Sequence, residues 1–228
     1  MEPLRLLGKI SFKDNGEKLT DLRKMLGGKA RFAKRGRYLL RQTAAEKLLE
    51  AVSFLPKGYR FQINLAFRTR EEQEDAWEKI YEALRRKHRK LPKNKVVQMA
   101  NKITLPVNGS IAPFLMTGGA LAAALVSPAG REVEMTNRKV KGRKREAGSR
   151  IEAKEWATDY PGLHRAIKKN RQILVKALTK AGFVNYPKEW WHWSYGDHLW
   201  ALLKNKPYAI YGPVESTDKR ETDQLKLI

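Results

Sequence analysis

The most chemically promising stretch of the sequence is EWWHWSYGDHLW, residues 189–200, in which a glutamate stands three positions before a histidine. A carboxylate beside a metal-bound water can act as a general base, and a nearby histidine can be a metal ligand. Residues three apart on a regular strand point to opposite faces, so Glu189 and His192 converge only if the chain bends near Trp190. The alternative is an aromatic core strand whose histidine makes a structural hydrogen bond.

The chain is strongly basic, with 47 Lys and Arg residues against 24 Asp and Glu and a formal net charge of +23. Such a charge favours polyanionic partners such as nucleic acid, an anionic membrane surface or an acidic wall polymer, although a solvated basic surface has the same composition. Two runs, residues 85–95 and 138–150, concentrate the positive charge. The candidate polyanion-binding residues are Arg85, Arg86, Lys87, Arg89, Lys90, Arg138, Lys139, Lys141, Arg143, Lys144 and Arg145.

The sequence contains no cysteine, which excludes disulfides and thiolate metal sites. Its first residues lack a long apolar segment with a small-residue cleavage site, so no signal peptide is predicted. Residues 103–130 carry no charge, but prolines and glycines interrupt them, which favours buried loop and strand over a membrane span. We therefore expect a cytoplasmic protein. Nothing in the sequence indicates an oligomeric state.

The N-terminal half is predicted to contain helices on either side of a strand. Thr43 with Glu46, and Thr69 with Glu72, have the spacing of a capping box, in which a hydroxyl and a carboxylate satisfy exposed amides at a helix start. Between these helices, residues 59–67 alternate apolar and polar side chains, the pattern of a half-buried strand. A shorter helix is expected around residues 96–101.

The C-terminal half begins with a continuous apolar run over residues 120–126, which predicts a buried strand. Residues 128–130 are expected to turn the chain into a second strand near Val133. A helix whose start signal lies at residues 159–161 carries an apolar stripe and is expected to stop at Gly182. This pattern predicts a helix packed on a sheet.

The last predicted elements are strands within residues 183–194 and a short helix over residues 196–203. We find no internal repeat and no compositional break that would mark a linker. The economical interpretation is an α+β fold with a central antiparallel sheet flanked by helices. We expect a single domain over residues 1–213, followed by a polar tail over residues 214–228.

Several short motifs, taken together, resemble the D-alanyl-D-alanine dipeptidase family, which includes the vancomycin-resistance zinc D,D-dipeptidases. The resemblance covers roughly residues 39–213, and the EWWHW segment with its downstream Tyr-Gly-Asp is the most specific part. The motifs are Ala66-Phe-Arg68, Gln73 in the following helix, LMTGGALAAALV, Ala181-Gly-Phe183, EWWHWSYGDHLWA and Tyr211-Gly-Pro213.

The resemblance implies a small α+β domain that binds one zinc through a histidine, an aspartate and a second histidine, and that hydrolyses a peptidoglycan dipeptide. Carried over by position, Glu189 matches the general base, His192 the last zinc ligand and Arg68 the arginine that stabilises the transition state. The chain departs from the family at the first two ligands. Alignment on the Thr-Gly-Gly-Ala segment places Leu115 and Ala122 there, and neither side chain can bind a metal.

No shift of the alignment restores these ligands, because there is no histidine between His88 and His164 and no aspartate between Asp75 and Asp159. A substitute site from His164, Asp197 and His198 is conceivable. However, the last two residues are interpreted as the start of a surface helix.

Three hypotheses about function follow. The first is a metal-free pseudoenzyme whose pocket, lined by Arg68, Glu189, His192 and the tryptophans, still binds a small dipeptide or an amino acid. The second is an active zinc dipeptidase with a rebuilt ligand set. The third is a basic protein that binds a polyanion such as nucleic acid on the same fold. We expect no cofactor under the first hypothesis and zinc only under the second.

Overall fold

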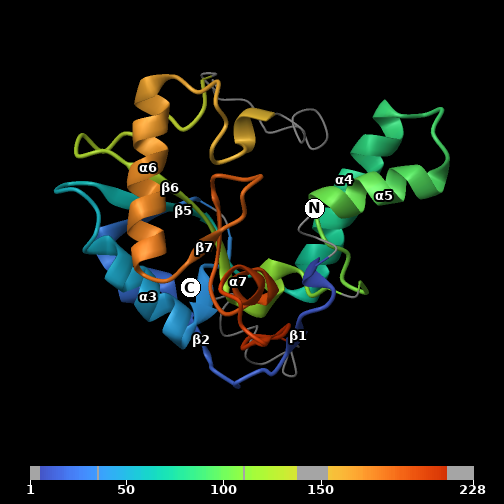
Figure 1. The fold of residues 1–228 in the computed structure, drawn as a ribbon, viewed down its shortest axis with the longest axis horizontal. Helices are drawn as coiled ribbons and strands as arrows, with labels where there is room; N and C mark the ends of the chain where they lie inside the picture. The colour runs from blue at the N-terminus through green and yellow to red at the C-terminus, as the bar shows by residue number, and fades with distance from the viewer. Residues whose placement is uncertain (1–5, 35, 110, 138–153, 215–228) are drawn as a thin grey trace.

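A five-stranded sheet forms the centre of the computed structural model, which describes residues 6–34, 36–109, 111–137 and 154–214 (Figure 1). The strand order is β3-β5-β6-β8-β7, with β3 parallel to β5 and every other neighbouring pair antiparallel. The mixed α+β fold with a mainly antiparallel sheet is as predicted. The strands are β3 (Ala30–Phe32), β5 (Arg60–Leu65), β6 (Ala120–Val126), β7 (Val184–Asn185) and β8 (His192–Ser194).

Two helices, α3 (Gln42–Val52) and α6 (Arg165–Lys180), lie together beside the sheet in Figure 1 and supply the apolar side chains that cover it. The buried stripe of α6 packs in the same cluster as the apolar side chains of β6 and Trp193. This helix begins only after His164, later than the start signal at residues 159–161. The segment before α6 begins with the 3-10 helix η3 (Lys154–Trp156), and the carbonyl oxygens of residues 155, 157 and 158 accept hydrogen bonds from Arg171.

The structure confirms one predicted capping box and corrects the other. In α4 (Arg70–Lys87), Thr69 and Glu72 satisfy each other's backbone amides as expected. At the start of α3, by contrast, the amide and hydroxyl of Thr43 donate to the carboxylate of Glu17, at 2.8 and 2.9 Å. A carboxylate from a distant part of the chain therefore replaces the local partner.

The segment before α3 is joined to residues 208–212 by strand pairing and hydrogen bonds. Strand β1 (Ser11–Phe12) pairs in parallel with β9 (Tyr208–Ala209), and β2 (Leu19–Asp21) pairs antiparallel with β4 (Leu39–Arg41). The carboxylate of Asp14 accepts hydrogen bonds from the buried Arg41 guanidinium at 2.6 Å and from the Gly212 amide at 2.7 Å. The hydroxyl of Tyr211 donates to Glu17 at 2.9 Å. Short helices α2 (Leu22–Leu26) and α7 (His198–Leu203) complete this part.

Helices α4 and α5 (Lys93–Ile103) form a hairpin that projects from the sheet, on the right in Figure 1. We call residues 70–103 the arm. Its apolar side chains form a cluster separate from the main core. The predicted helix around residues 96–101 is thus confirmed and is longer than expected, since it begins directly after Pro92.

The predicted strand near Val133 is wrong. This segment forms only an isolated bridge between Val126 and Glu132, next to a hydrogen bond from the Val133 amide to the Leu125 carbonyl.

Within the described part of the chain, no helix is long and apolar enough to cross a bilayer. The basic run at residues 138–150 and the tail after residue 214 lie outside the described residues.

Candidate functional site

A turn between β7 and β8 brings Glu189 and His192 together. The Glu189 amide donates to the Tyr186 carbonyl at 2.9 Å, and the His192 amide donates to the Glu189 carbonyl at 3.0 Å. This turn places an oxygen of the Glu189 carboxylate 3.7 Å from Nδ1 of His192. The bend near Trp190 that the sequence required for convergence is therefore present, and β8 begins at the histidine itself.

The Arg68 guanidinium comes from the connection between β5 and α4. A register shift between Ile63 and Leu65 deforms β5 just before this connection, a feature often found beside functional sites. The Arg68 amide donates to the Leu115 carbonyl at 3.2 Å, and Nη1 donates to the Gln73 side chain at 3.1 Å. Burial lowers the pKa of Arg68, while the charges of Glu72 and Glu189 act in the opposite direction. Arg68 thus lies within electrostatic reach of the glutamate.

His192 occupies an enclosed position. Its side chain is 13% exposed, and the rings of Phe114 and Tyr186 pack against it with centroid distances of 5.3 and 5.9 Å. Burial, together with the positive charge of Arg68, lowers the pKa of His192 to about 4, so the imidazole is neutral at pH 7. Its Nε2 atom is buried and has no hydrogen-bond partner. A buried nitrogen of this kind costs free energy and marks a place where a ligand atom would be favourable.

Leu115 and Ala122 lie at this same place. Ala122 on β6 is the register partner of His192 on β8, so the two side chains share one face of the sheet as direct neighbours. Leu115 is in the 3-10 helix η2 (Phe114–Thr117) and is joined to Arg68 through its carbonyl. Both side chains are partly exposed. Ala122 and Glu189 thus both adjoin His192, and Leu115 is connected to them through Arg68, whose charge interacts with Glu189.

Comparison with known proteins identifies a family and a relative that this sequence resembles. A family model described as D-ala-D-ala dipeptidase matches residues 21–210, most of the chain. The chain belongs to the D-Ala-D-Ala dipeptidase family. A curated D-alanyl-D-alanine dipeptidase from Synechocystis sp. (strain PCC 6803) is 33% identical over 111 residues, which make up 43% of this chain and 43% of the relative. The match thus spans less than half of that relative's length.

Membership of the D-Ala-D-Ala dipeptidase family raises the question whether these residues fit a zinc ion. The orphaned Nε2 of His192 is suited to a metal or to another electron-pair acceptor. Leu115 and Ala122, however, present only hydrocarbon, whereas a catalytic zinc needs three protein ligands. No group of three His, Cys, Asp or Glu side chains that could hold a metal occurs among the residues with a described position. The three aligned positions offer a single donor side chain, and they do not fit zinc.

The substitute ligands considered for this dipeptidase-family chain have other roles. Asp197 and His198 do begin a helix, as predicted, but they are 0% and 3% exposed, so the predicted surface position is wrong. Asp197 caps α7 by accepting from the Trp200 amide at 2.9 Å and also accepts from the Ser194 hydroxyl at 2.7 Å. Burial raises its pKa to about 7 despite these hydrogen bonds. His164 precedes α6 and is exposed.

The candidate polyanion-binding residues are divided between the two basic runs. Arg85, Arg86, Lys87, Arg89 and Lys90 lie at the far end of the arm and are not part of the Glu189 site. The second set, from Arg138 to Arg145, lies outside the described residues. The sequence suggested the tryptophans as aromatic lining and did not identify Phe114 and Tyr186, because only the folded η2 segment and the end of β7 bring these rings to His192.

Proposed function

We propose that this chain is a metal-free pseudoenzyme of the D-Ala-D-Ala dipeptidase family. The observation that carries the proposal is the pairing of Ala122 with His192. At the position where the family resemblance calls for an aspartate, the histidine has a methyl group as its neighbour. A methyl group cannot complete a zinc site, and without a metal-bound water Glu189 has nothing to activate.

The remaining polar groups favour retained binding of a small dipeptide or an amino acid. Arg68 supplies a cation that can pair with a carboxylate, and Glu189 supplies an anion that can pair with an ammonium group. The neutral His192 ring can donate or accept a hydrogen bond through Nε2. This combination is complementary to a zwitterion, a small molecule that carries both a carboxylate and an ammonium group.

Metal analysis combined with an activity assay tests the proposal. The purified protein is loaded with zinc, dialysed and analysed for metal, and release of D-alanine from D-Ala-D-Ala is measured with and without a chelator. We expect much less than one zinc per chain and no cleavage that the chelator removes. Stoichiometric zinc with chelator-sensitive cleavage would instead establish an active enzyme with a rebuilt ligand set.

The binding half of the proposal needs a separate measurement. Titration calorimetry with D-Ala-D-Ala as the probe is expected to detect binding by the parent protein. Arg68→Met keeps much of the side-chain length but removes the charge, and it should weaken binding at least tenfold, as expected for a lost charge-assisted hydrogen bond. The control variant, Arg70→Met, changes an exposed arginine two positions away and should leave binding unaltered. Absence of binding by the parent would refute the retained pocket but not the loss of zinc.

A further inference from the structure

The end of the arm carries a dense set of cations that the candidate site does not use. We call residues 85–95, RRKHRKLPKNK, the arm tip; it contains seven Lys and Arg residues and no acid. Apart from Arg85 and His88, all of its residues are exposed. No arm-tip cation forms an ion pair with any residue whose position is described. The positive charge is thus presented to solvent, and Glu82, the acid nearest to the tip along α4, lies one helical turn before it.

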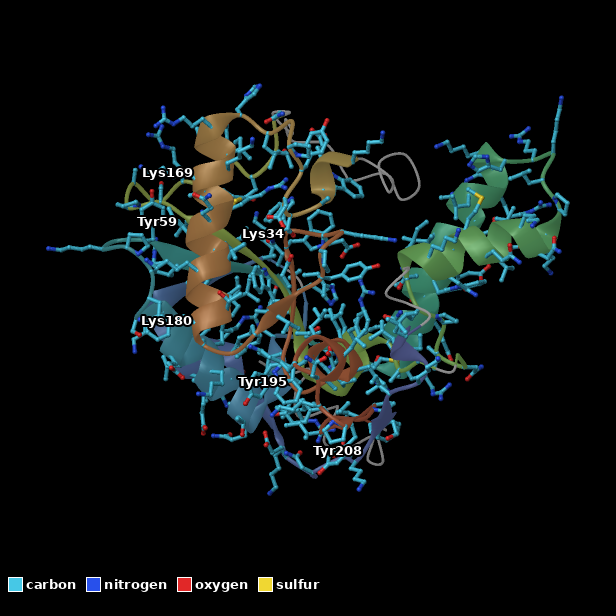
Figure 2. All side chains as sticks on the ribbon, viewed as in Figure 1. Lys34, Tyr59, Lys169, Lys180, Tyr195 and Tyr208 are labelled. Atoms are coloured by element: carbon cyan, nitrogen blue, oxygen red, sulfur yellow. The ribbon has the colours of Figure 1, made fainter. Side chains whose placement is uncertain are left out.

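The arm holds this tip away from the sheet in a defined geometry. Leu84, Val96 and Ala100 form a small buried cluster between α4 and α5. Trp77 stacks on Tyr81 with ring centroids 5.2 Å apart, and its indole donates to Asn101 at 2.8 Å. The arm is therefore packed internally along its length, and its side chains project into open space around it (Figure 2).

Helix stability explains only part of the tip's charge. Arg85, Arg86 and Lys87 occupy the last turn of α4, where cations are favoured by the helix dipole. Lys93 and Lys95 occupy the first turn of α5, which has no acidic residue and no side-chain cap. Cations at a helix N-terminus oppose the helix dipole. These two lysines therefore cost folding stability, and a partner of opposite charge would offset that cost.

We propose that the arm tip binds the phosphate backbone of duplex nucleic acid. A projecting, acid-free cluster is complementary to the closely spaced phosphates of a duplex. A membrane surface is less suitable, because Leu91 is the one large apolar side chain that the tip exposes, at 39%. Base stacking is also disfavoured, since Trp77 and Tyr81 pack within the arm. Contacts to phosphates alone predict binding without sequence preference.

Fluorescence anisotropy with a labelled 20-base-pair duplex DNA, titrated at several salt concentrations, tests this proposal. The tip variant is Arg86→Gln/Lys87→Gln/Lys90→Gln/Lys93→Gln. The matched control, Arg165→Gln/Lys168→Gln/Lys169→Gln/Lys176→Gln, removes the same charge from exposed positions on α6, where Lys169 lies far from the arm (Figure 2). We expect the tip variant to lose at least tenfold in affinity, and the slope of log affinity against log salt to become shallower by about 3. The control should change affinity less than threefold.

A second variant keeps the test decisive if the first folds poorly. Lys93→Glu/Lys95→Glu places acids at the start of α5, so it should raise the stability of the arm while lowering affinity for DNA. Equal losses in the tip and control variants would overturn the proposal in favour of general charge attraction. Tip-dependent binding to vesicles of phosphatidylcholine and phosphatidylserine, without tip-dependent DNA binding, would overturn it in favour of a membrane surface. The inference does not depend on the function proposed for the Glu189 site.

Discussion

Gln73 accepts a hydrogen bond from Nη1 of Arg68 at 3.1 Å, and this contact joins the candidate site to the base of the arm. The side-chain nitrogen of Gln73, Nε2, donates to the Thr104 hydroxyl at 2.9 Å and to the Leu105 carbonyl at 2.8 Å. The Gln73 side chain is 2% exposed, so water does not replace these bonds if they are lost. The Gln73 side chain thus helps to hold both Arg68 and the C-terminal end of α5 in place.

Replacing Gln73 with leucine should therefore lower the free energy of unfolding by about 1–3 kcal/mol, since it leaves partly buried polar groups on three partners without this hydrogen bond. Urea unfolding measures the effect. Gln98→Leu, at an exposed position on α5, is the matched control and should stay within about 0.5 kcal/mol of the parent. A Gln73 variant as stable as the control would show that the bridge contributes nothing.

The double variant Leu115→His/Ala122→Asp should restore a zinc site. It supplies the two missing donor side chains next to His192, and together they make the three ligands that a catalytic zinc requires. We expect about one zinc per chain, removable by chelator, and cleavage of D-Ala-D-Ala. Each single substitution should bind zinc far more weakly than the double variant. A folded double variant that binds no zinc would mean that these residues do not stand at the family's ligand positions.

The N-terminus of α3 allows the stability contributions of Glu17 and Glu46 to be compared directly. Glu17→Ala removes the acceptor of the Thr43 amide and hydroxyl and also of the Tyr211 hydroxyl. Loss of a helix cap typically costs 0.5–2 kcal/mol, and the Tyr211 contact adds to this, so we expect a loss of about 2–3 kcal/mol in unfolding free energy. Glu46→Ala, which a local capping box would make costly, should cost less than about 0.5 kcal/mol. The reverse order, measured by thermal or urea unfolding, would restore the capping box.

Asp197 should make the protein less stable as the pH rises. Its pKa in the folded protein is about 7, raised by burial from an ordinary 3.8, so its contribution is complete below pH 3.8 and is lost as the pH rises toward 7. Asp197→Asn keeps a good helix cap and cannot ionise. Relative to the parent, the variant should gain about 2–4 kcal/mol of stability between pH 4 and pH 7.5.

His192 gives the opposite pH dependence, because its pKa is lowered to about 4 and its contribution is lost as the pH falls from 6.5 toward 4. The absolute stability curve therefore mixes two opposing trends. The difference between the Asp197→Asn variant and the parent isolates the aspartate, since the histidine is present in both proteins. A difference that does not change with pH would show that Asp197 is ionised throughout this range.

The sequence patterns predicted the elements whose signals are local. The apolar run of β6, the stripe of α6 and the Thr69 capping box all appear in the structure, because each depends on residues within one or two helical turns or along one strand. The alignment also selected Ala122, which pairs with His192, and Leu115, whose carbonyl accepts from the Arg68 amide. These positions could be found because the family motif fixes their spacing.

Features formed between distant segments could not be predicted in this way. Glu17 reaches Thr43 only after β2 has paired with β4, so the local Thr43–Glu46 pattern was misleading. The burial of Asp197 and His198 comes from the surrounding packing, whereas their polar type and position before a short helix indicated a surface. In the same way, the rings around His192 come from two separate segments.

The N-terminal segment that contains Asp14 and Glu17 also limits how far the protein can be truncated. The family match begins at residue 21, whereas Asp14 and Glu17 lie before it. A fragment designed to the family boundary would lose the carboxylate that neutralises the 6%-exposed Arg41 and the carboxylate that caps α3. An unpaired buried guanidinium is strongly destabilising. We therefore expect a stable fragment to include both carboxylates, which lie upstream of the residues that the family model matches.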